Sequence, residues 1–159
     1  MVAPWRYEGA ARSLILGLKL RGRRDLVVPL ADAMAAEAER VGIATTALTW
    51  VPGRRSEAAR RGFDHAHLLA VELGRRLGLP VTPLLARTRP AIDQTTLGAR
   101  DRARNLRGAF TSSPAPRSVG LVDDLVTTGA TASSCAVALE AAGAGRIEVV
   151  VPARADPTR

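Results

Sequence analysis

The sequence predicts an α/β fold: one domain over residues 1–159, built as a single doubly wound, mostly parallel sheet with helices on both faces. Short apolar, β-branched segments alternate with segments of helical periodicity, which is typical of parallel sheets. The chain has 159 residues, a length that suits one domain. Hydrophobic residues make up 47% of it and aromatic residues only 3%, so an aliphatic core between layers is expected.

The first half of the chain predicts three helices and two strands. Leu14, Ile15 and Leu18 recur at helical spacing, and similar spacing follows in the next apolar segment. TTALTWV is β-branched and apolar, which favours a strand that ends at Val51. The expected helices span 7–20, 26–41 and about 56–77, and the expected strands span 45–51 and 80–86.

The second half predicts a long loop followed by strands around one helix. Residues 86–107 are polar, rich in Arg and without a clean period, as in a functional or mobile loop. SVGLVDD is an apolar run typical of a central parallel strand. The expected strands span 108–113, 118–124 and 146–153, and the expected helix spans 130–143.

The charge of the chain favours anionic partners. The formal net charge is +8, and Lys19 is the single lysine among 23 basic residues. Such a balance suits phosphates, pyrophosphate or nucleic acid. Cys135 is the single cysteine, so no disulfide can form within the chain, and we expect a cytoplasmic protein. No apolar run approaches the roughly 18 residues of a membrane span, so no membrane association is expected.

The stretch VGLVDDLVTTGATAS carries the clearest chemistry. Asp123 and Asp124 end an apolar strand, where open α/β sheets bind their ligands. The loop that follows leads into a helix, whose N-terminus presents free N–H groups to an anion. Carboxylates accept hydrogen bonds and therefore suit the vicinal hydroxyls of a sugar. The stretch predicts a ribose 5-phosphate site, with the diol on the two aspartates and the phosphate on Thr127, Thr128, Gly129, Ala130 and Thr131.

At these residues the chain resembles the type I phosphoribosyltransferases. Their signature is an apolar strand, two acidic residues and a Thr-Thr-Gly-Thr-like loop, and VGLVDDLVTTGAT matches it. The resemblance implies an enzyme that binds 5-phosphoribosyl 1-pyrophosphate (PRPP) with Mg²⁺, the ion being held mainly through PRPP. It would transfer ribose 5-phosphate to a nitrogen nucleophile, such as a nucleobase, and release pyrophosphate. Asp124 could also act as a base toward the incoming amine.

Three further segments resemble the competence protein F branch (ComF, or GntX-like) of that class: YEGAARSLILGLKLRGRRDL, VPGRRSEAARRGFDHAHLLA and DQTTLGARDRARNLRGAF. The branch usually carries Arg-Gly-Phe-Asn-Gln, whereas this chain has Asp64 and His65 at the last two positions. Many members begin with a four-cysteine zinc ribbon. The resemblance therefore implies a member without that ribbon, whether short or truncated.

The resemblance also implies where the rest of the site lies. A loop after an early strand would contact the pyrophosphate, and VPGRR at 51–55 is the candidate, with Pro52, Gly53 and Arg54. Residues 86–107 would form a mobile lid that excludes water, with Arg87 and Arg89 pairing the leaving group. A hood for the acceptor would come from residues 1–25 or from the segment around His65. A homodimer is common in the class.

Several alternatives remain beside this reading. A Walker B strand end requires a G-x-x-x-x-G-K-[ST] loop, which the chain lacks. Lys19 could contact an anion in the hood, although a solvated helix end is favoured. His65 and His67 lie two residues apart and face different ways, so a metal pair is not expected, while His65 could lie near the site. The alternative function is a catalytically weak PRPP-fold module acting in DNA uptake or as a PRPP sensor, with nucleic acid as a possible partner.

Overall fold

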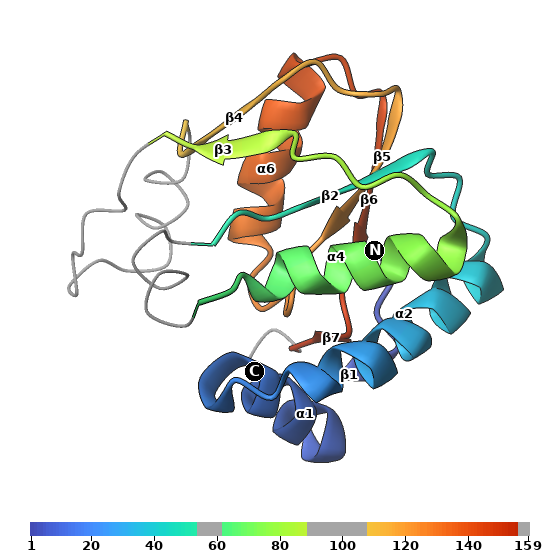
Figure 1. The fold of residues 1–159 in the computed structure, drawn as a ribbon. Coiled ribbons are helices and arrows are strands. Elements are labelled where there is room, and N and C mark those ends of the chain that lie inside the picture. The colour runs from blue at the N-terminus through green and yellow to red at the C-terminus, as the bar shows by residue number, and fades with distance from the viewer. Residues whose placement is uncertain (54–61, 89–107, 156–159) are drawn as a thin grey trace.

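A computed structural model describes residues 1–53, 62–88 and 108–155 (Figure 1). Arg54, Arg89 and most of the expected lid lie outside the described residues. Within them no helix is long and apolar enough to cross a membrane. The elements in chain order are β1 (Trp5–Arg6), α1 (Gly9–Arg21), η1 (Arg24–Leu26), α2 (Val27–Val41), β2 (Ala47–Trp50), α4 (His65–Leu77), β3 (Leu85–Arg87), β4 (Phe110–Ser112), β5 (Ser118–Val122), α6 (Ala130–Ala141), β6 (Arg146–Val150) and β7 (Ala153–Arg154).

The central sheet contains β2, β5 and β6 in that order, and all its pairs are parallel. Its middle strand is β5, as the apolar run before Asp123 predicted. Trp50 pairs with Val122, which in turn pairs with Val150, so the three strands end at the same edge. The predicted α/β class with helices and parallel pairing is confirmed. The pairing differs from one continuous sheet, because β3–β4 form a separate antiparallel pair and β1–β7 a separate parallel pair.

Helices cover both faces of the central sheet. Side chains alternate along a strand, so Val122 packs into the cluster that contains the buried residues of α2 and α4, whereas Leu121 packs against α6. Figure 1 shows α2 and α4 running side by side on one face. The second cluster joins α6 to β3 and β4, and Cys135 is fully buried in it. Each face therefore has its own aliphatic core.

Three predicted boundaries differ most from the structure. The strand expected over 80–86 appears as an isolated bridge between Val81 and Leu48 and then as β3 at Leu85–Arg87. The third helix was expected from about residue 56, but α4 begins at His65 because Gly62 has φ 77° and Asp64 is extended; residues 54–61 lie outside the described part. The last strand was expected to run to residue 153. It stops at Val150 because Pro152 has no N–H for a ladder, and the chain then pairs with β1 as β7.

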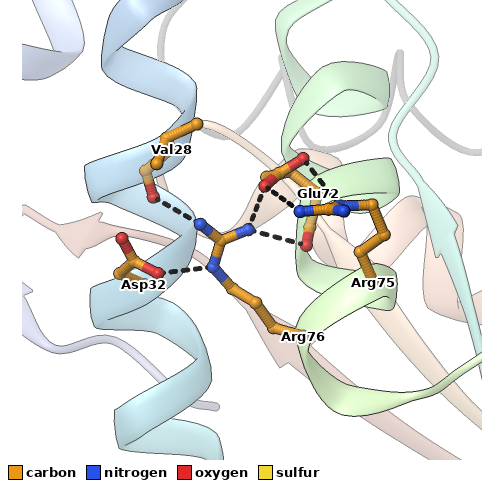
Figure 2. Close-up of polar contacts among 5 residues, drawn as sticks. All are labelled: Val28, Asp32, Glu72, Arg75 and Arg76. Atoms are coloured by element: carbon orange, nitrogen blue, oxygen red, sulfur yellow. Dashed lines mark hydrogen bonds and ion pairs between the residues drawn. The ribbon is translucent and has the colours of Figure 1, made fainter.

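Arg76 fastens α4 to α2 (Figure 2). Its Nε donates to Asp32 Oδ1 of α2 at 2.6 Å, and its second terminal nitrogen reaches the Val28 carbonyl at 3.4 Å. The remaining nitrogen pairs with Glu72 one turn earlier on α4. The Arg76 side chain is 18% exposed, whereas that of Arg75, which also pairs with Glu72, is 74% exposed. Arg76 therefore connects α4 to α2, whereas the contact of Arg75 stays within α4.

We expect Arg76→Ala to lower the free energy of unfolding by about 1–2 kcal/mol, because it breaks hydrogen bonds between helices and removes packed methylenes. Arg75→Ala is the matched control and should change it by less than about 0.5 kcal/mol, since exposed ion pairs contribute little. Urea unfolding followed by circular dichroism measures both. Equal losses in the two variants would contradict the role of Arg76.

Candidate functional site

A cleft of about 280 Å³ lies at the carboxyl edge of the central sheet. Val51 N donates to Val122 O at 2.9 Å and Asp123 N to Val150 O at 3.3 Å, so the segments after the three strands stay together. This is the edge where open α/β sheets bind ligands. The lining residues are Lys19, Val51, Pro52, Gly53, Phe63, Asp64, His65, Ala66, Arg87, Asp123, Asp124, Leu125, Thr127 and Thr131.

The loop after β5 is held from outside by β7. Val126 N donates to Ala153 O at 3.3 Å, and Ala155 N donates to Val126 O at 2.8 Å. One edge of β7 pairs with β1, and its other edge forms a parallel bridge between Arg154 and Val126. The short strand after Pro152 therefore supports the loop. The loop is therefore fixed at three places: by β5 before it, by β7 at Val126 and by α6 after it.

The residues of the predicted phosphate cradle, 127–131, span the loop before α6 and the start of its first turn. Gly129 has φ 75°, a conformation that glycine adopts without strain, and it turns the chain into the helix. Thr128 Oγ1 accepts a hydrogen bond from Ala130 N at 3.4 Å. Thr127 and Thr131 line the cleft, whereas Gly129 lines a separate hollow on the outer side of α6. The start of the helix supplies the N–H groups of its first turn at the cleft wall.

The two aspartates lie next to each other at the cleft, Asp124 buried and Asp123 partly buried. Asp123 Oδ1 accepts a hydrogen bond from Asp124 N at 2.8 Å, which fixes the first side chain against the backbone of the second. Burial, and then the charge of Asp124, raise the pKa of Asp123 to about 7. Asp124 itself is 8% exposed. Keeping both carboxylates ionised here requires nearby positive charge.

Lys19 and His65 surround Asp124. The Lys19 Nζ lies 3.0 Å from Asp124 Oδ1, and His65 Nδ1 lies 3.8 Å from Asp124 Oδ2. The expectation that Lys19 is a solvated helix end was wrong, because the fold brings α1 over the strand edge. His65 lies at the site, as one of the alternatives held, while His67 stacks on Trp50 with ring centroids 4.4 Å apart.

The candidate pyrophosphate loop is braced by the start of α4. Asp64 caps that helix, since its Oδ1 accepts from Ala66 N at 3.1 Å and from His67 N at 3.3 Å. Its Oδ2 accepts from Gly53 N at 2.9 Å. A Cβ at position 53 would lie 3.2 Å from that Oδ2, so glycine permits the close approach. One carboxylate thus holds two walls of the cleft together.

Arg87 forms the opposite wall. Its Nε donates to Pro52 O at 3.1 Å, and its guanidinium lies over the Phe110 ring at 4.6 Å from the centroid. A guanidinium in this position presents planar donors that suit phosphate oxygens. The side chain is therefore held between the second strand end and β4 at the edge of the cleft.

The structure brings together most of the residues that the sequence singled out. Those lining the cleft are Asp123, Asp124, Thr127, Thr131, Pro52, Gly53 and Arg87. Thr128, Gly129 and Ala130 lie in the adjoining turn, and Arg54 and Arg89 lie outside the described residues. The sequence did not assign Asp64 a role, although an Asp before an apolar period is a cap signal. Among the described residues no group of three or more His, Cys, Asp or Glu could hold a metal ion.

Because Asp64 both caps α4 and accepts from Gly53 N, two substitutions of it should differ in how much stability they cost. Asp64→Ala should lower the free energy of unfolding by about 1 kcal/mol, since the cap is lost. Asp64→Asn keeps a carbonyl oxygen for the cap but sets an amide N–H₂ opposite Gly53 N, so the loss should be smaller. In both variants the Gly53 amide should exchange hydrogen faster than in the wild type, as measured by NMR. An unchanged exchange rate would refute the brace.

The raised pKa of Asp123 predicts a pH-dependent gain in stability for Asp123→Asn. The folded-state pKa is about 7 against an ordinary value of 3.8, so the folded protein binds a proton that the unfolded chain has released. Stability therefore falls as the pH rises through this window. Asn cannot ionise and keeps an oxygen for Asp124 N. Urea unfolding at about pH 4.5 and pH 8 should show the variant gaining about 1–3 kcal/mol over the wild type, and a constant difference would contradict this.

Curated proteins similar in sequence carry names from DNA uptake and use. The chain is 36% identical to "Competence protein F" of Haemophilus influenzae over 102 residues, which cover 60% of this chain and 44% of that protein. It is 40% identical to "DNA utilization protein YhgH" of Escherichia coli strain K12 over 93 residues, covering 57% and 41%. The chain thus spans less than half the length of these two relatives in the matched regions. No family model matches it.

Solved structures with a similar fold include two enzymes whose names contain PRPP or phosphoribosyltransferase. A glutamine PRPP amidotransferase from B. subtilis matches 85% of this chain and 30% of its own, with a TM-score of 0.57 and 18% identity. Adenine phosphoribosyltransferase from Leishmania tarentolae matches 84% of this chain and 59% of its own, with a TM-score of 0.50 and 20% identity. These likenesses concern the fold. The chain is therefore related in sequence to competence protein F and has the fold of the type I phosphoribosyltransferases, as its motifs predicted.

Proposed function

We propose that this protein binds PRPP with Mg²⁺ and transfers its ribose 5-phosphate to a nitrogen nucleophile, releasing pyrophosphate. The observation that carries the proposal is the composition of the cleft. Two carboxylates, Asp123 and Asp124, lie next to the loop at Thr127 that leads into α6, and Arg87 lies on the opposite wall. A ligand with a diol, a phosphate and a second anionic group would find acceptors for the diol at the aspartates, donors for the phosphate at the loop before α6, and a cation for the second anion at Arg87.

The expected roles follow from the charges of those parts. The aspartates accept hydrogen bonds from the ribose hydroxyls, and the N–H groups and hydroxyls at the start of α6 donate to the 5-phosphate. Arg87 and the loop at Pro52 and Gly53 face the pyrophosphate, with Arg54 and Arg89 as further candidates. Mg²⁺, a cation that prefers oxygen ligands, would be held mainly through the oxygen atoms of PRPP and would supply positive charge to the leaving pyrophosphate.

The chemical step exchanges one bond at the anomeric carbon for another. The nucleophile's nitrogen forms a bond to that carbon while the bond to the pyrophosphate oxygen breaks, and pyrophosphate leaves with the electron pair. Positive charge develops on the ribose ring, and fixed carboxylates nearby stabilise it. The nucleophile's proton passes to a base, for which the Asp123–Asp124 pair is the candidate.

A second candidate function is a binding module without efficient transfer, acting in DNA uptake. The names of the relatives at 36% and 40% identity and the formal net charge of +8 favour it. Such a module would bind DNA with an affinity that falls steeply with salt, because phosphate contacts release counterions. The two functions therefore differ in the ligand that the protein recognises.

Isothermal titration with PRPP, with and without Mg²⁺, tests the first candidate. The wild type should bind in the micromolar range with Mg²⁺. Asp123→Asn/Asp124→Asn should bind about 100-fold more weakly, because two charge-assisted acceptors are lost. Asp25→Asn, an exposed aspartate paired with Arg23, is the matched control and should bind like the wild type.

Thermal unfolding of each variant separates lost binding from lost folding. Binding by the wild type should be followed by a search for pyrophosphate release with different nucleophiles. If the folded wild type binds no PRPP at millimolar concentration, the proposed function is wrong, and a salt series with single-stranded DNA then tests the second candidate.

A further inference from the structure

Lys19 joins the N-terminal helix to the centre of the cleft. Its Nζ donates to Asp124 Oδ1 at 3.0 Å, across 105 positions of the sequence. The Lys19 side chain is 37% exposed and that of Asp124 is 12% exposed, so the ammonium lies between solvent and a nearly buried carboxylate. This ion pair differs from surface pairs such as Arg23–Asp25, in which both side chains are more than half exposed.

The packing of α1 directs Lys19 to this place. Ile15 and Leu18 are 1% exposed and seat the helix on the core. Lys19 follows Ile15 by one helical turn, so both lie on the same side of α1. Gly22, with φ 64°, then ends the helix, and the chain turns away into η1. The buried face of α1 and its fixed end therefore determine that Lys19 lies at the cleft.

The charges around the aspartate pair show why the pair needs a cation. Asp123 is adjacent, and Asp64 adds a third carboxylate that raises the pKa of Asp123 further, whereas Lys19 lowers it. His65 lies 3.8 Å from Asp124 on α4. The remaining titratable groups near the pair are Arg87, which donates a hydrogen bond to Pro52 O, and Cys135, whose thiol stays neutral because burial raises its pKa to about 12. Among the described residues, the basic side chain that forms a salt bridge with Asp124 is that of Lys19.

We propose that Lys19 is a positioning residue of the site, whose ammonium holds the Asp124 carboxylate in place as an acceptor for a ligand hydroxyl and supplies the positive charge that the aspartate pair needs. A carboxylate has about four acceptor positions, so Asp124 can hold Lys19 through Oδ1 and still accept from a ligand. The part of the proposal that concerns the hydroxyl rests on the proposed function. The ionisation of the pair does not, and it can be measured without a ligand.

Three variants separate charge from shape. Lys19→Met removes the ammonium and keeps a linear side chain, and Lys19→Arg restores a cation. Arg12→Met is the matched control, because Arg12 is an exposed cation on the same helix that does not line the cleft. Thermal unfolding verifies that each variant is folded.

The first readout is the titration of the aspartate carboxyl carbons by ¹³C NMR in the ligand-free protein. The midpoints of the Asp123–Asp124 pair should move up by about 1 pH unit or more in Lys19→Met, since an adjacent cation favours the ionised form. They should stay in place in Arg12→Met and return toward the wild type in Lys19→Arg. Unmoved midpoints in a folded Lys19→Met would overturn the proposal.

The second readout is PRPP affinity by isothermal titration at pH 6.5 and pH 8.5. Lys19→Met should bind about tenfold more weakly at the lower pH and recover part of the loss at the higher pH, where the pair ionises without help. If the wild type binds PRPP and Lys19→Met binds equally at both pH values, the role toward the ligand is wrong while the proposed function stands. If the wild type does not bind PRPP, the proposed function fails, and the titration alone decides whether Lys19 keeps the pair ionised.

Discussion

The parallel register of β2, β5 and β6 is the constraint on which the site depends. Because Trp50, Val122 and Val150 pair across the sheet, the segments that follow them leave the same edge together. The aspartates and the loop at Gly53 therefore lie together although they are far apart in the sequence. A shift of one residue in either pairing would turn the strand side chains to the opposite face and separate the two loops. The pairing of β7 with the loop at Val126 adds a second support.

Placing two carboxylates at this edge is unfavourable for the fold taken alone. Burial and mutual repulsion oppose the ionised form of Asp123, and nothing in the packing of the core requires an acid there. The surrounding structure offsets part of the cost through Lys19 and through the hydrogen bond from the Asp124 N–H. A chain that keeps such an arrangement gives up stability at the place where a ligand would restore it. This is the physical reason to treat the aspartate pair as a candidate site.

The sequence predicted the parts of the structure that depend on local order. The run before Asp123, the acids and the turn at Gly129 follow one another within a short stretch, so strand, site and helix could be placed together. Lys19 could not be assigned, because its role depends on how α1 packs over a strand edge 105 positions away. The start of α4 was misplaced because helical periodicity outweighed the cap signal of Asp64. The division of the last strand at Pro152 follows from a missing N–H, a property of every proline, so the sequence does carry the signal for it.

The charge arrangement of the cleft also bears on the two candidate functions. Its volume of about 280 Å³ suits a small ligand, and its floor carries carboxylates while Lys19 and Arg87 supply the cations. A nucleic-acid strand needs a continuous cationic track for its backbone, and the two aspartates would repel it here. Binding of DNA would therefore use the arginines of another surface. A protein of this kind could hold a phosphorylated sugar in the cleft and a polyanion elsewhere, and the two activities would then respond differently to the loss of Asp124.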